Sequence, residues 1–564
     1  MMIISEEFKK QFYDIITQRT TCVILNTDAD ALCAFKILNT LLKFDDIGVT
    51  FVAIDSNSDL QNVMNGCVQE GGAILLINCG INKNLTLFET PDDVIIFVLD
   101  SRRPACLENI YTDKDLRILI PDCDIEDMQI PSYNKICEYN SSDDEDVEND
   151  ESNLERQLRL EGRARKYNQN QRNEITAYYK FSWTAIASSI FMLELAHSLG
   201  KSNVELMWCG VVGLTSQMID KLITQDAFTN ACVERLSMLI KKFTTLKADG
   251  LDRSDDKMRL TFDLELLLPL YRHWTLEKSM SQAENYIAKA KLYTQGGKGK
   301  MKHLLVDLGI ELSEVTQNYS TLNAERRKEI FKILLEDQMK KYAGFTAHFG
   351  YYTKYSASDF SRILSNEMAK NVTKEPASKR IMNAWVLLGN FIEGFTQKEN
   401  VPKAIEDYKV SLEAVTELAY NYLNTSQVFI TRQYCIIRPH STLDLHYLHS
   451  SHFFGIFASM IKKCYTASKR NRNIFSVPLL FEIPGFGDTV EYTKIIGHMP
   501  LNTNYSDDGY IKNSISSIFY NVLQSSSHIV YLKESFDPNV VYVRMDQRHS
   551  FYDAVGIYIE SNII

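Results

Sequence analysis

The stretch from residue 22 to residue 38, CVILNTDADALCAFKIL, constrains the fold more than any other part of the chain. It begins with an apolar run at residues 22–25, which is typical of a strand buried on both faces. After Asp30 the apolar residues recur at helical spacing, and Thr27 or Asp28 can cap the helix. The sequence therefore predicts a buried strand that runs directly into a helix, with two carboxylates at the join.

Two further apolar runs end in polar residues. Residues 73–77 lead into Asn78, and residues 94–99 lead into Asp100. A fourth run at residues 49–54 completes the predicted sheet. Because ligands bind beyond the carboxyl ends of neighbouring parallel strands, these polar residues are expected to share one crevice with the two carboxylates of the first stretch. Asp and Asn are also common turn formers and caps, so residue type alone leaves a purely structural role open.

Composition limits the kind of protein. A net charge of −11 argues against coating nucleic acid by bulk charge, although it leaves room for a local basic groove. The 11 cysteines are scattered and form no C-x-x-C pair, which indicates reduced thiols in the cytosol or nucleus and no zinc site. No apolar run approaches ~18 residues, and the first residues lack signal-peptide form, so neither a transmembrane helix nor a secretory leader is predicted.

Two adjacent segments of opposite charge follow the first strands. Seven acidic residues lie between residues 141 and 151, and such a block repels itself, so a disordered, solvated linker is predicted. The alternative is a docking site for a basic partner. Residues 153–172 then carry six basic side chains against two acidic ones and predict a projecting helix that is polar nearly all round. That helix is either neutralised by the acidic segment or binds a partner through Arg156, Arg159 and Arg163.

Two clusters that could suggest ligand sites are interpreted as structural. Residues 296–300, GGKGK, are predicted to form a flexible turn, because no Ser or Thr follows the last lysine as a phosphate loop requires. His446 and His449 have a metal-ligand spacing, with His440 and His452 nearby, but no convincing further ligand set accompanies them. We expect these histidines to be surface or packing residues.

The ordered motifs resemble the RecJ-like branch of the DHH phosphoesterase superfamily. The D-x-D-x-D-G motif of that superfamily stands here as NTDADA at residues 26–31. Its D-C-G motif is NCG at residues 78–80, and D-H-H-x-P is DSRRP at residues 100–104. A fourth motif, G-T-x-A-D, is similar to GLTSQ at residues 213–217. The framework is kept, while several acidic and histidine positions are exchanged.

That combination resembles the cell division cycle protein 45 family, eukaryotic replication factors that are inactive relatives of these enzymes. Further stretches match it at residues 208–224, 270–280 and 346–359, and the length and the acidic run fit as well. The resemblance implies a degenerate site. Its residues are Asn26, Asp28, Asp30, Asn78, Asp100, Arg102 and Gln217.

Charge arithmetic at this inherited site predicts that it is not catalytic. The family pattern implies six carboxylates and a histidine, whereas this chain keeps three carboxylates and puts Arg102 in place of the histidine. A two-metal site needs hard anionic ligands, and the neutral Asn78 stands where a bridging carboxylate is implied. We therefore expect no catalytic residue, no metal and no cofactor. Arg102 is predicted to turn toward Asp28 or Asp30 as an ion pair. The alternative is that Arg102 points to solvent and one metal ion binds Asp28 and Asp30 loosely.

The resemblance also implies the domain organisation. The fold class is α/β, with a RecJ-like DHH parallel-sheet domain, a helical inter-domain region and a smaller C-terminal α/β domain of the DHH-associated type. The glycine-rich GGGH motif of that last domain is missing. The expected bounds are 1–225 for the first domain, with the acidic linker at 141–152 and the projecting helix at 153–180, then 226–380 and 381–564.

The implied function is a non-catalytic scaffold of the eukaryotic replicative helicase, acting in the nucleus in initiation and elongation of DNA replication. The implied partners are the minichromosome-maintenance hexamer, which the protein would brace with the GINS complex, other replication-initiation factors, and single-stranded DNA. No membrane partner is expected. Two other classes stay open: an active metal-dependent single-strand exonuclease or phosphodiesterase, and a general single-strand-binding protein.

Overall fold

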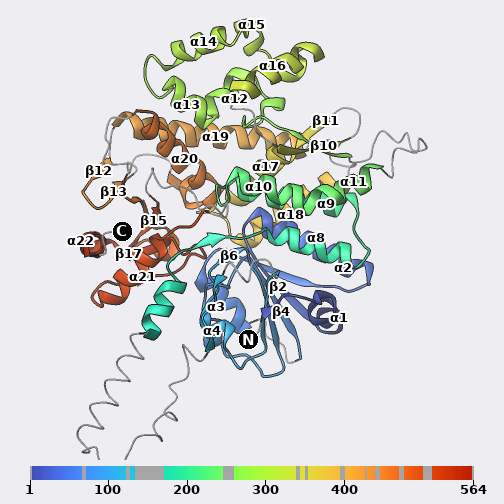
Figure 1. Ribbon diagram of the computed structural model, residues 1–564, viewed down its shortest axis with the longest axis vertical. Coiled ribbons are helices and arrows are strands. Elements are labelled where there is room, and N and C mark those ends of the chain that lie inside the picture. Colours follow the sequence, from blue (N-terminus) through green and yellow to red (C-terminus); the bar gives the residue numbers. More distant parts are fainter. Residues whose placement is uncertain are drawn as a thin grey trace, which may run out of the picture.

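The structure is a computed structural model in which three parts can be followed (Figure 1). The first sheet lies at the bottom of that view, a set of helices at the top, and a second sheet at the left. The predicted acidic linker and the predicted partner-binding residues Arg156, Arg159 and Arg163 lie outside the described residues. The described ranges are 3–66, 71–121, 128–133, 170–245, 259–337, 343–349, 353–393, 400–425, 428–438, 445–468, 476–499 and 511–561.

The first part is built on a six-stranded sheet in the order β1-β7-β5-β4-β2-β3. Every neighbouring pair in it is parallel, so the predicted parallel sheet is confirmed. Its central strands are continuous apolar runs because both faces are covered. The strands are β1 (Ile3–Ile4), β2 (Thr21–Asn26), β3 (Thr50–Ile54), β4 (Ala73–Ile77), β5 (Ile95–Leu99) and β7 (Leu116–Leu119).

Alternate residues of β2 enter two different cores. Val23 and Leu25 belong to the core that α2 (Ala29–Phe44), α8 (Ser188–Ser198) and α9 (Val204–Ile219) build on one face. Ile24 belongs to the core of the opposite face, which α3 (Asn57–Gly66) and α4 (Leu107–Ile110) cover. The helices α8 and α9 come after the segment 134–169, so the chain returns to the first sheet, as the motif order implied.

A helical region follows and has a core of its own at the top of Figure 1. Residues 297–300 form the first turn of α14, so the prediction of a flexible turn there is wrong. Met301 and Leu305, one helical turn apart, are buried in this core, and their burial outweighs the glycines that precede them. The helices of this region are α12 (Leu276–Gln282), α13 (Glu284–Ala290), α14 (Gly297–Asp307), α15 (Leu312–Val315) and α16 (Ala324–Asp337), whereas α10 (Gln225–Ala231) and α11 (Ser237–Thr245) pack into the core that α2, α8 and α9 build on the first sheet.

Three further helices connect this region to the two sheets. They are α17 (Ala357–Ala369), which packs on α9, α18 (Ala377–Glu393), which packs on β3, and α19 (Asn400–Thr425), which packs on α17 and α20. A small antiparallel sheet that the sequence did not predict stands beside them. Its strands are β9 (Arg259–Leu264), β10 (Ala343–Phe349) and β11 (Thr353–Ser356).

The C-terminal part is a mixed six-stranded sheet in the order β12-β13-β14-β15-β17-β16, which confirms the predicted second α/β unit. Only β13 and β14 pair in parallel. Phe454 of α20 (Ser451–Ser468) packs against Phe481 on one face, while α21 (Ile515–Ser525) and α22 (Arg548–Ser561) cover the other. The strands are β12 (Val428–Ile430), β13 (Cys435–Ile437), β14 (Leu479–Pro484), β15 (Tyr492–His498), β16 (Tyr531–Leu532) and β17 (Val540–Arg544).

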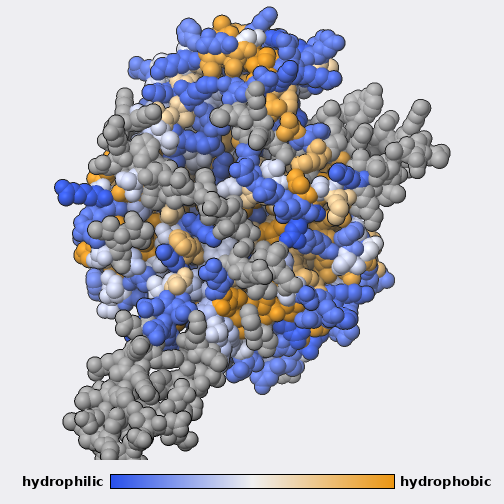
Figure 2. All heavy atoms as spheres, viewed as in Figure 1, coloured by the Kyte–Doolittle hydropathy of each residue, from blue (hydrophilic) through white to orange (hydrophobic). Residues whose placement is uncertain are grey.

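Hydrophilic side chains cover most of the described surface on the face drawn in Figure 2. An apolar patch near the top lies over the region of α14–α16, where Val306 and Leu312 are exposed. Among the helices of the described ranges, none combines the length and the apolar character that a bilayer crossing requires.

Candidate functional site at the strand ends

Asp28 stands where β2 gives way to α2 and caps that helix. Its Oδ1 accepts a hydrogen bond of 2.7 Å from the backbone N–H of Ala31. Its Oδ2 accepts one of 2.7 Å from Nδ2 of Asn26, the last residue of the strand. The predicted cap is confirmed, and both carboxylate oxygens of Asp28 already have donors from its own segment.

Asn78 is the centre of the site. It follows β4 with a left-handed φ of +53°, a conformation that asparagine tolerates better than most residues. Its Nδ2 donates to Asp28 Oδ1 and Asp30 Oδ2, each at 3.0 Å. Its Oδ1 accepts from the Ser188 hydroxyl at 2.7 Å and from the Ser101 backbone N–H at 3.3 Å. One neutral amide therefore joins the two carboxylates where the resemblance implied a bridging acid.

Asp30 is buried, and its carboxylate caps the N-terminus of α8, a helix that is distant in sequence. Its Oδ2 accepts from the Ser188 N–H and its Oδ1 from the Ser189 N–H, both at 2.9 Å. These are the first residues of α8, whose own N-cap, Ala187, offers no side-chain acceptor. A Cβ at Gly213 of α9 would collide with the Ser189 hydroxyl and lie 2.9 Å from Asp30 Oδ1. That close approach explains the glycine of the fourth motif.

Arg102 turns into the site. Its Nη2 lies 3.8 Å from Asp28 Oδ2, and its Nη1 lies 3.4 Å from Asp100 Oδ1. Its backbone N–H also donates to Asp100 Oδ1 at 2.9 Å, and Nη1 donates to the backbone oxygen of Asn78. The predicted ion pair with Asp28 is therefore present, and the pair with Asp100 is an addition that the sequence did not predict.

Burial shifts the acid–base properties of these groups. It raises the pKa of Asp28 to about 6; the nearby Arg102 guanidinium opposes this shift and the Asp30 carboxylate adds to it. Burial also raises the pKa of Asp100, again opposed by Arg102. The guanidinium thus compensates part of the cost of holding the buried carboxylate of Asp100 and the partly buried one of Asp28 in one place.

Six of the seven predicted site residues join one network, which we call the strand-end network: Asn26, Asp28, Asp30, Asn78, Asp100 and Arg102. The seventh, Gln217 of α9, lines the same cavity, but neither of its buried amide atoms has a hydrogen-bond partner among the described residues. Ser188 and Ser189 belong to the network and were missed. A serine pair ahead of an apolar helical pattern signals a helix start, but nothing in the sequence connects it to Asp30.

The donor set of the strand-end network does not suit a pair of divalent cations. Each carboxylate oxygen of Asp28 and Asp30 accepts at least one N–H group, and a guanidinium stands beside Asp28. Divalent cations in such sites need free, hard anionic oxygens. Across the ranges that the structure describes, no three His, Cys, Asp or Glu side chains gather into a metal-ligating group.

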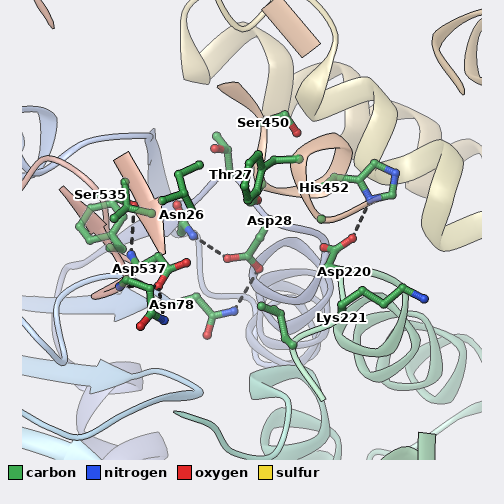
Figure 3. A pocket seen from close by; sticks show the side chains of 18 of the residues that line it. Asn26, Thr27, Asp28, Asn78, Asp220, Lys221, Ser450, His452, Ser535 and Asp537 are labelled. Atoms are coloured by element: carbon green, nitrogen blue, oxygen red, sulfur yellow. Dashed lines mark hydrogen bonds and ion pairs between the residues drawn. The ribbon is translucent and has the colours of Figure 1, made fainter. Parts of the chain in front are cut away.

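The network opens onto a cavity of about 1870 Å³ between the first sheet and the C-terminal part. Figure 3 shows Asn26, Asp28 and Asn78 near its centre and the pair of Asp220 and His452 on another wall. In that pair, His452 Nδ1 and Asp220 Oδ1 are 2.6 Å apart, so His452 is a buried packing residue, as the sequence suggested.

The wall contributed by the C-terminal part carries lysines as well as the carboxylates of Asp488, Glu534 and Asp537. Lys494 of β15 is buried there, and burial lowers its pKa to about 8. Lys462 and Lys463 of α20 line the same cavity, and burial lowers the pKa of Lys462. The cavity therefore has one wall with the carboxylates of the strand-end network and another, which we call the lysine wall, where Lys462, Lys463 and Lys494 stand near carboxylates.

Fold and site together define an α/β protein with two sheets and a helical region, in which a polar cluster at the carboxyl edge of the parallel sheet faces the mixed sheet. The CDC45 family model matches residues 21–161 and 134–556, and the chain belongs to this family. Membership of this family gives the chain a role in DNA replication and the cell cycle.

Relatives match over most of the length. The human cell division control protein 45 homolog is 26% identical over 573 residues, which is 97% of this chain and 98% of that one. Cell division control protein 45 of Saccharomyces cerevisiae is 23% identical over 63% of each chain. The crystal structure of CDC45 from Entamoeba histolytica aligns with a TM-score of 0.67 at 17% identity, covering 99% of this chain and 100% of that chain, and it shares the fold.

Proposed function

We propose that the protein is a non-catalytic scaffold subunit of the eukaryotic replicative helicase that acts in the nucleus. The observation that carries this proposal is the strand-end network itself. Asn78 bridges Asp28 and Asp30 by its amide, and Arg102 places a cation beside Asp28. A protein with a replication role and a strand-end site filled by its own side chains is better suited to assembly than to phosphodiester cleavage.

The magnitude of the charge effect supports the absence of nuclease chemistry. A unit positive charge about 4 Å from a divalent cation is repelled by roughly 8 kcal/mol at an effective dielectric of ~20. Arg102 Nη2 lies 3.8 Å from Asp28 Oδ2, where such a cation would bind. To admit the metal, Arg102 would have to leave and Asn78 would have to release both carboxylates. The alternative function, an active metal-dependent exonuclease, requires both events.

The proposed partners are the minichromosome-maintenance hexamer, which the protein braces, the GINS complex and other replication-initiation factors. The segment carrying Arg156, Arg159 and Arg163 is the proposed contact with them, because residues 153–172 hold six basic side chains against two acidic ones. Single-stranded DNA is a further proposed ligand. Its phosphates would meet the lysine wall of the cavity, although the overall charge of −11 keeps the affinity low.

Affinity purification of the tagged full chain from nuclear extract tests the proposal. We expect the hexamer and the GINS complex to co-purify, and Arg156→Glu, Arg159→Glu and Arg163→Glu combined to reduce their recovery at least several-fold. The control reverses three exposed lysines of α14, Lys298, Lys300 and Lys302, which makes the same change in charge elsewhere. Equal recovery of the partner proteins with both variants would contradict the assigned contact. Failure of the wild type to recover them would contradict the scaffold role.

A further inference from the structure

A loop of the C-terminal sheet crosses to the first sheet. Residues 533–537, which we call the strap, lie in the loop that connects β16 to β17. Within the strap, Phe536 is only 3% exposed, and it is part of the core on one face of the first sheet. Neither core that covers its own sheet includes it. The strap is therefore inserted into the neighbouring part of the molecule.

The carboxylate of Glu534 occupies the N-terminus of α3. Its Oε2 accepts from the Ser58 N–H at 2.9 Å and from the Ser58 hydroxyl at 2.5 Å. The backbone oxygen of Glu534 accepts from the Asn57 N–H at 2.8 Å. The first turn of a helix is an anion-binding position, because its free N–H groups and the helix dipole both favour negative charge. Here that position is filled from within the chain.

Lys83 and Asn82 hold the strap from the other side. Lys83 Nζ donates to the backbone oxygens of Lys533 and Ser535, each at 2.7 Å. Asn82 Nδ2 donates to the backbone oxygen of Phe536 at 2.6 Å. Burial lowers the pKa of Lys83 to about 8, and the charge of Lys533 adds to that effect. Lys83 donates to neutral main-chain carbonyls in these bonds and has no carboxylate partner within the ranges that the structure describes, so its charge is held there at a cost.

The strap borders the cavity beside the strand-end network. Figure 3 shows Ser535 and Asp537 next to Asn26 and Asn78, and all four residues line the cavity. The Asp537 carboxylate is close enough to Arg102 to help raise the pKa of that guanidinium.

We propose that the strap is an autoinhibitory contact: it opens locally, and single-stranded nucleic acid competes with it for the cavity. This rests on the proposed single-strand contact. One aromatic side chain and a few hydrogen bonds to residues 57–58 and 82–83 fasten the strap, so it can open without disrupting either sheet. The two-way backbone pairing of Ser182 with Asn513 continues to tie the parts together.

Hydrogen exchange on the full chain tests the opening. The variant is Lys83→Met, and the matched control is Lys278→Met, which removes a lysine from an exposed ion pair with Glu413. We expect the amides of Asn57, Ser58 and the strap to exchange at least ~10-fold faster in Lys83→Met, with the amides of β2 and β4 unchanged. Unchanged exchange at the strap, or equal acceleration throughout the protein, would overturn the proposal.

Fluorescence anisotropy with a labelled thymidine oligonucleotide at ~50 mM salt tests the competition. Lys83→Met loses a positive charge, so bulk electrostatics predicts weaker binding, whereas release of the strap predicts binding several-fold tighter than wild type. Lys278→Met should bind no more tightly than wild type. Equal or weaker binding by Lys83→Met would overturn the competition. Failure of all three proteins to bind would refute the proposed single-strand contact and the competition with it, while the exchange experiment still decides whether the strap opens.

Discussion

The strand-end network and the strap contacts lie at the same edge of the first sheet, but their hydrogen bonds run to different places. In the network, Asn78 and the start of α8 donate to Asp28 and Asp30, so every partner belongs to the part built on the first sheet. At the strap, Lys83 donates to main-chain oxygens of the C-terminal part. The strand-end network is formed by residues of the first part alone, whereas the strap contacts join the first part to the C-terminal part.

This difference predicts which property of the protein a substitution in each cluster should change. Asp30 and Asn78 are 3% and 2% exposed, so losing a partner there leaves buried groups unsatisfied and costs folding free energy. Lys83 is only partly buried, and we expect its loss to release the strap. Variants of the network should therefore change global stability, and variants of the strap should change local opening.

The largest effect is expected from Asp30→Ala. The change leaves the N–H groups of Ser188 and Ser189 and one amide donor of Asn78 without an acceptor in a buried place. We expect a loss of about 3–5 kcal/mol in the free energy of unfolding, measured by urea denaturation. Asp307→Ala, at an exposed position of α14, should stay within about 0.5 kcal/mol of wild type. A loss below about 1 kcal/mol in Asp30→Ala would contradict the network.

Asn78→Asp restores the acid that the resemblance implies, and it should destabilise the protein. The new carboxylate would lie about 3 Å from those of Asp28 and Asp30, with like charges facing each other. We expect a loss of about 2 kcal/mol at pH 7.5 that shrinks as the pH falls toward 5, because protonation relieves the repulsion. Thermal denaturation at pH 7.5 and pH 5, with and without manganese, measures the loss of stability and its dependence on pH. Recovery of stability on adding manganese would show that Arg102 does not exclude a metal.

The raised pKa of Asp28 predicts a smaller, pH-dependent effect. A carboxyl whose pKa is about 6 in the folded protein and about 4 in the unfolded chain stabilises the fold below pH 4, and that contribution is lost as the pH rises through 6. Compared with Asp28→Asn, the wild type should therefore lose up to about 2 kcal/mol between pH 4 and pH 7. Urea midpoints at the two pH values check this. A difference between the proteins that is constant, or that changes in the wild type's favour, would contradict the assigned shift.

The smallest effect concerns the strap. The pKa of Lys83 is lowered to about 8 when the strap is closed and should return toward its ordinary value when it opens. A lowered pKa means that the charged form disfavours closure, so closure should gain up to about 1 kcal/mol as the pH rises from 7 to 9. Strap protection in hydrogen exchange, corrected for the intrinsic rate, should rise over this range in wild type and stay level in Lys83→Met. A fall in strap protection in the wild type as the pH rises would contradict the predicted sign of this pH dependence.

Much of this site could be predicted because parallel strands end at one edge. The apolar runs of β2, β4 and β5 are continuous, so their ends, and with them Asp28, Asn78 and Asp100, could be located from sequence. The direction of Arg102 followed from charge alone. The ends of strands and the pairing of opposite charges are local or pairwise effects, which the type and order of the residues determine.

The parts that could not be predicted depend on tertiary contacts. Asp30 caps α8 across more than 150 residues of sequence, and the strap uses main-chain oxygens, which are the same for every residue type. The sheet of β9, β10 and β11 brings together segments about 80 residues apart. Residues 297–300 form a helix because Met301 and Leu305 find a core, which the glycine-rich sequence alone does not reveal.

The claim that the strand-end network excludes a two-metal centre has a direct test. Crystals of the wild-type protein soaked in manganese can be measured for anomalous scattering near the manganese edge. We predict no anomalous peak within coordinating distance of Asp28, Asp30 and Asp100, with the contacts of Arg102 and Asn78 retained. Two peaks about 3.5–4 Å apart among these carboxylates, with Arg102 displaced, would contradict it and favour an active phosphodiesterase.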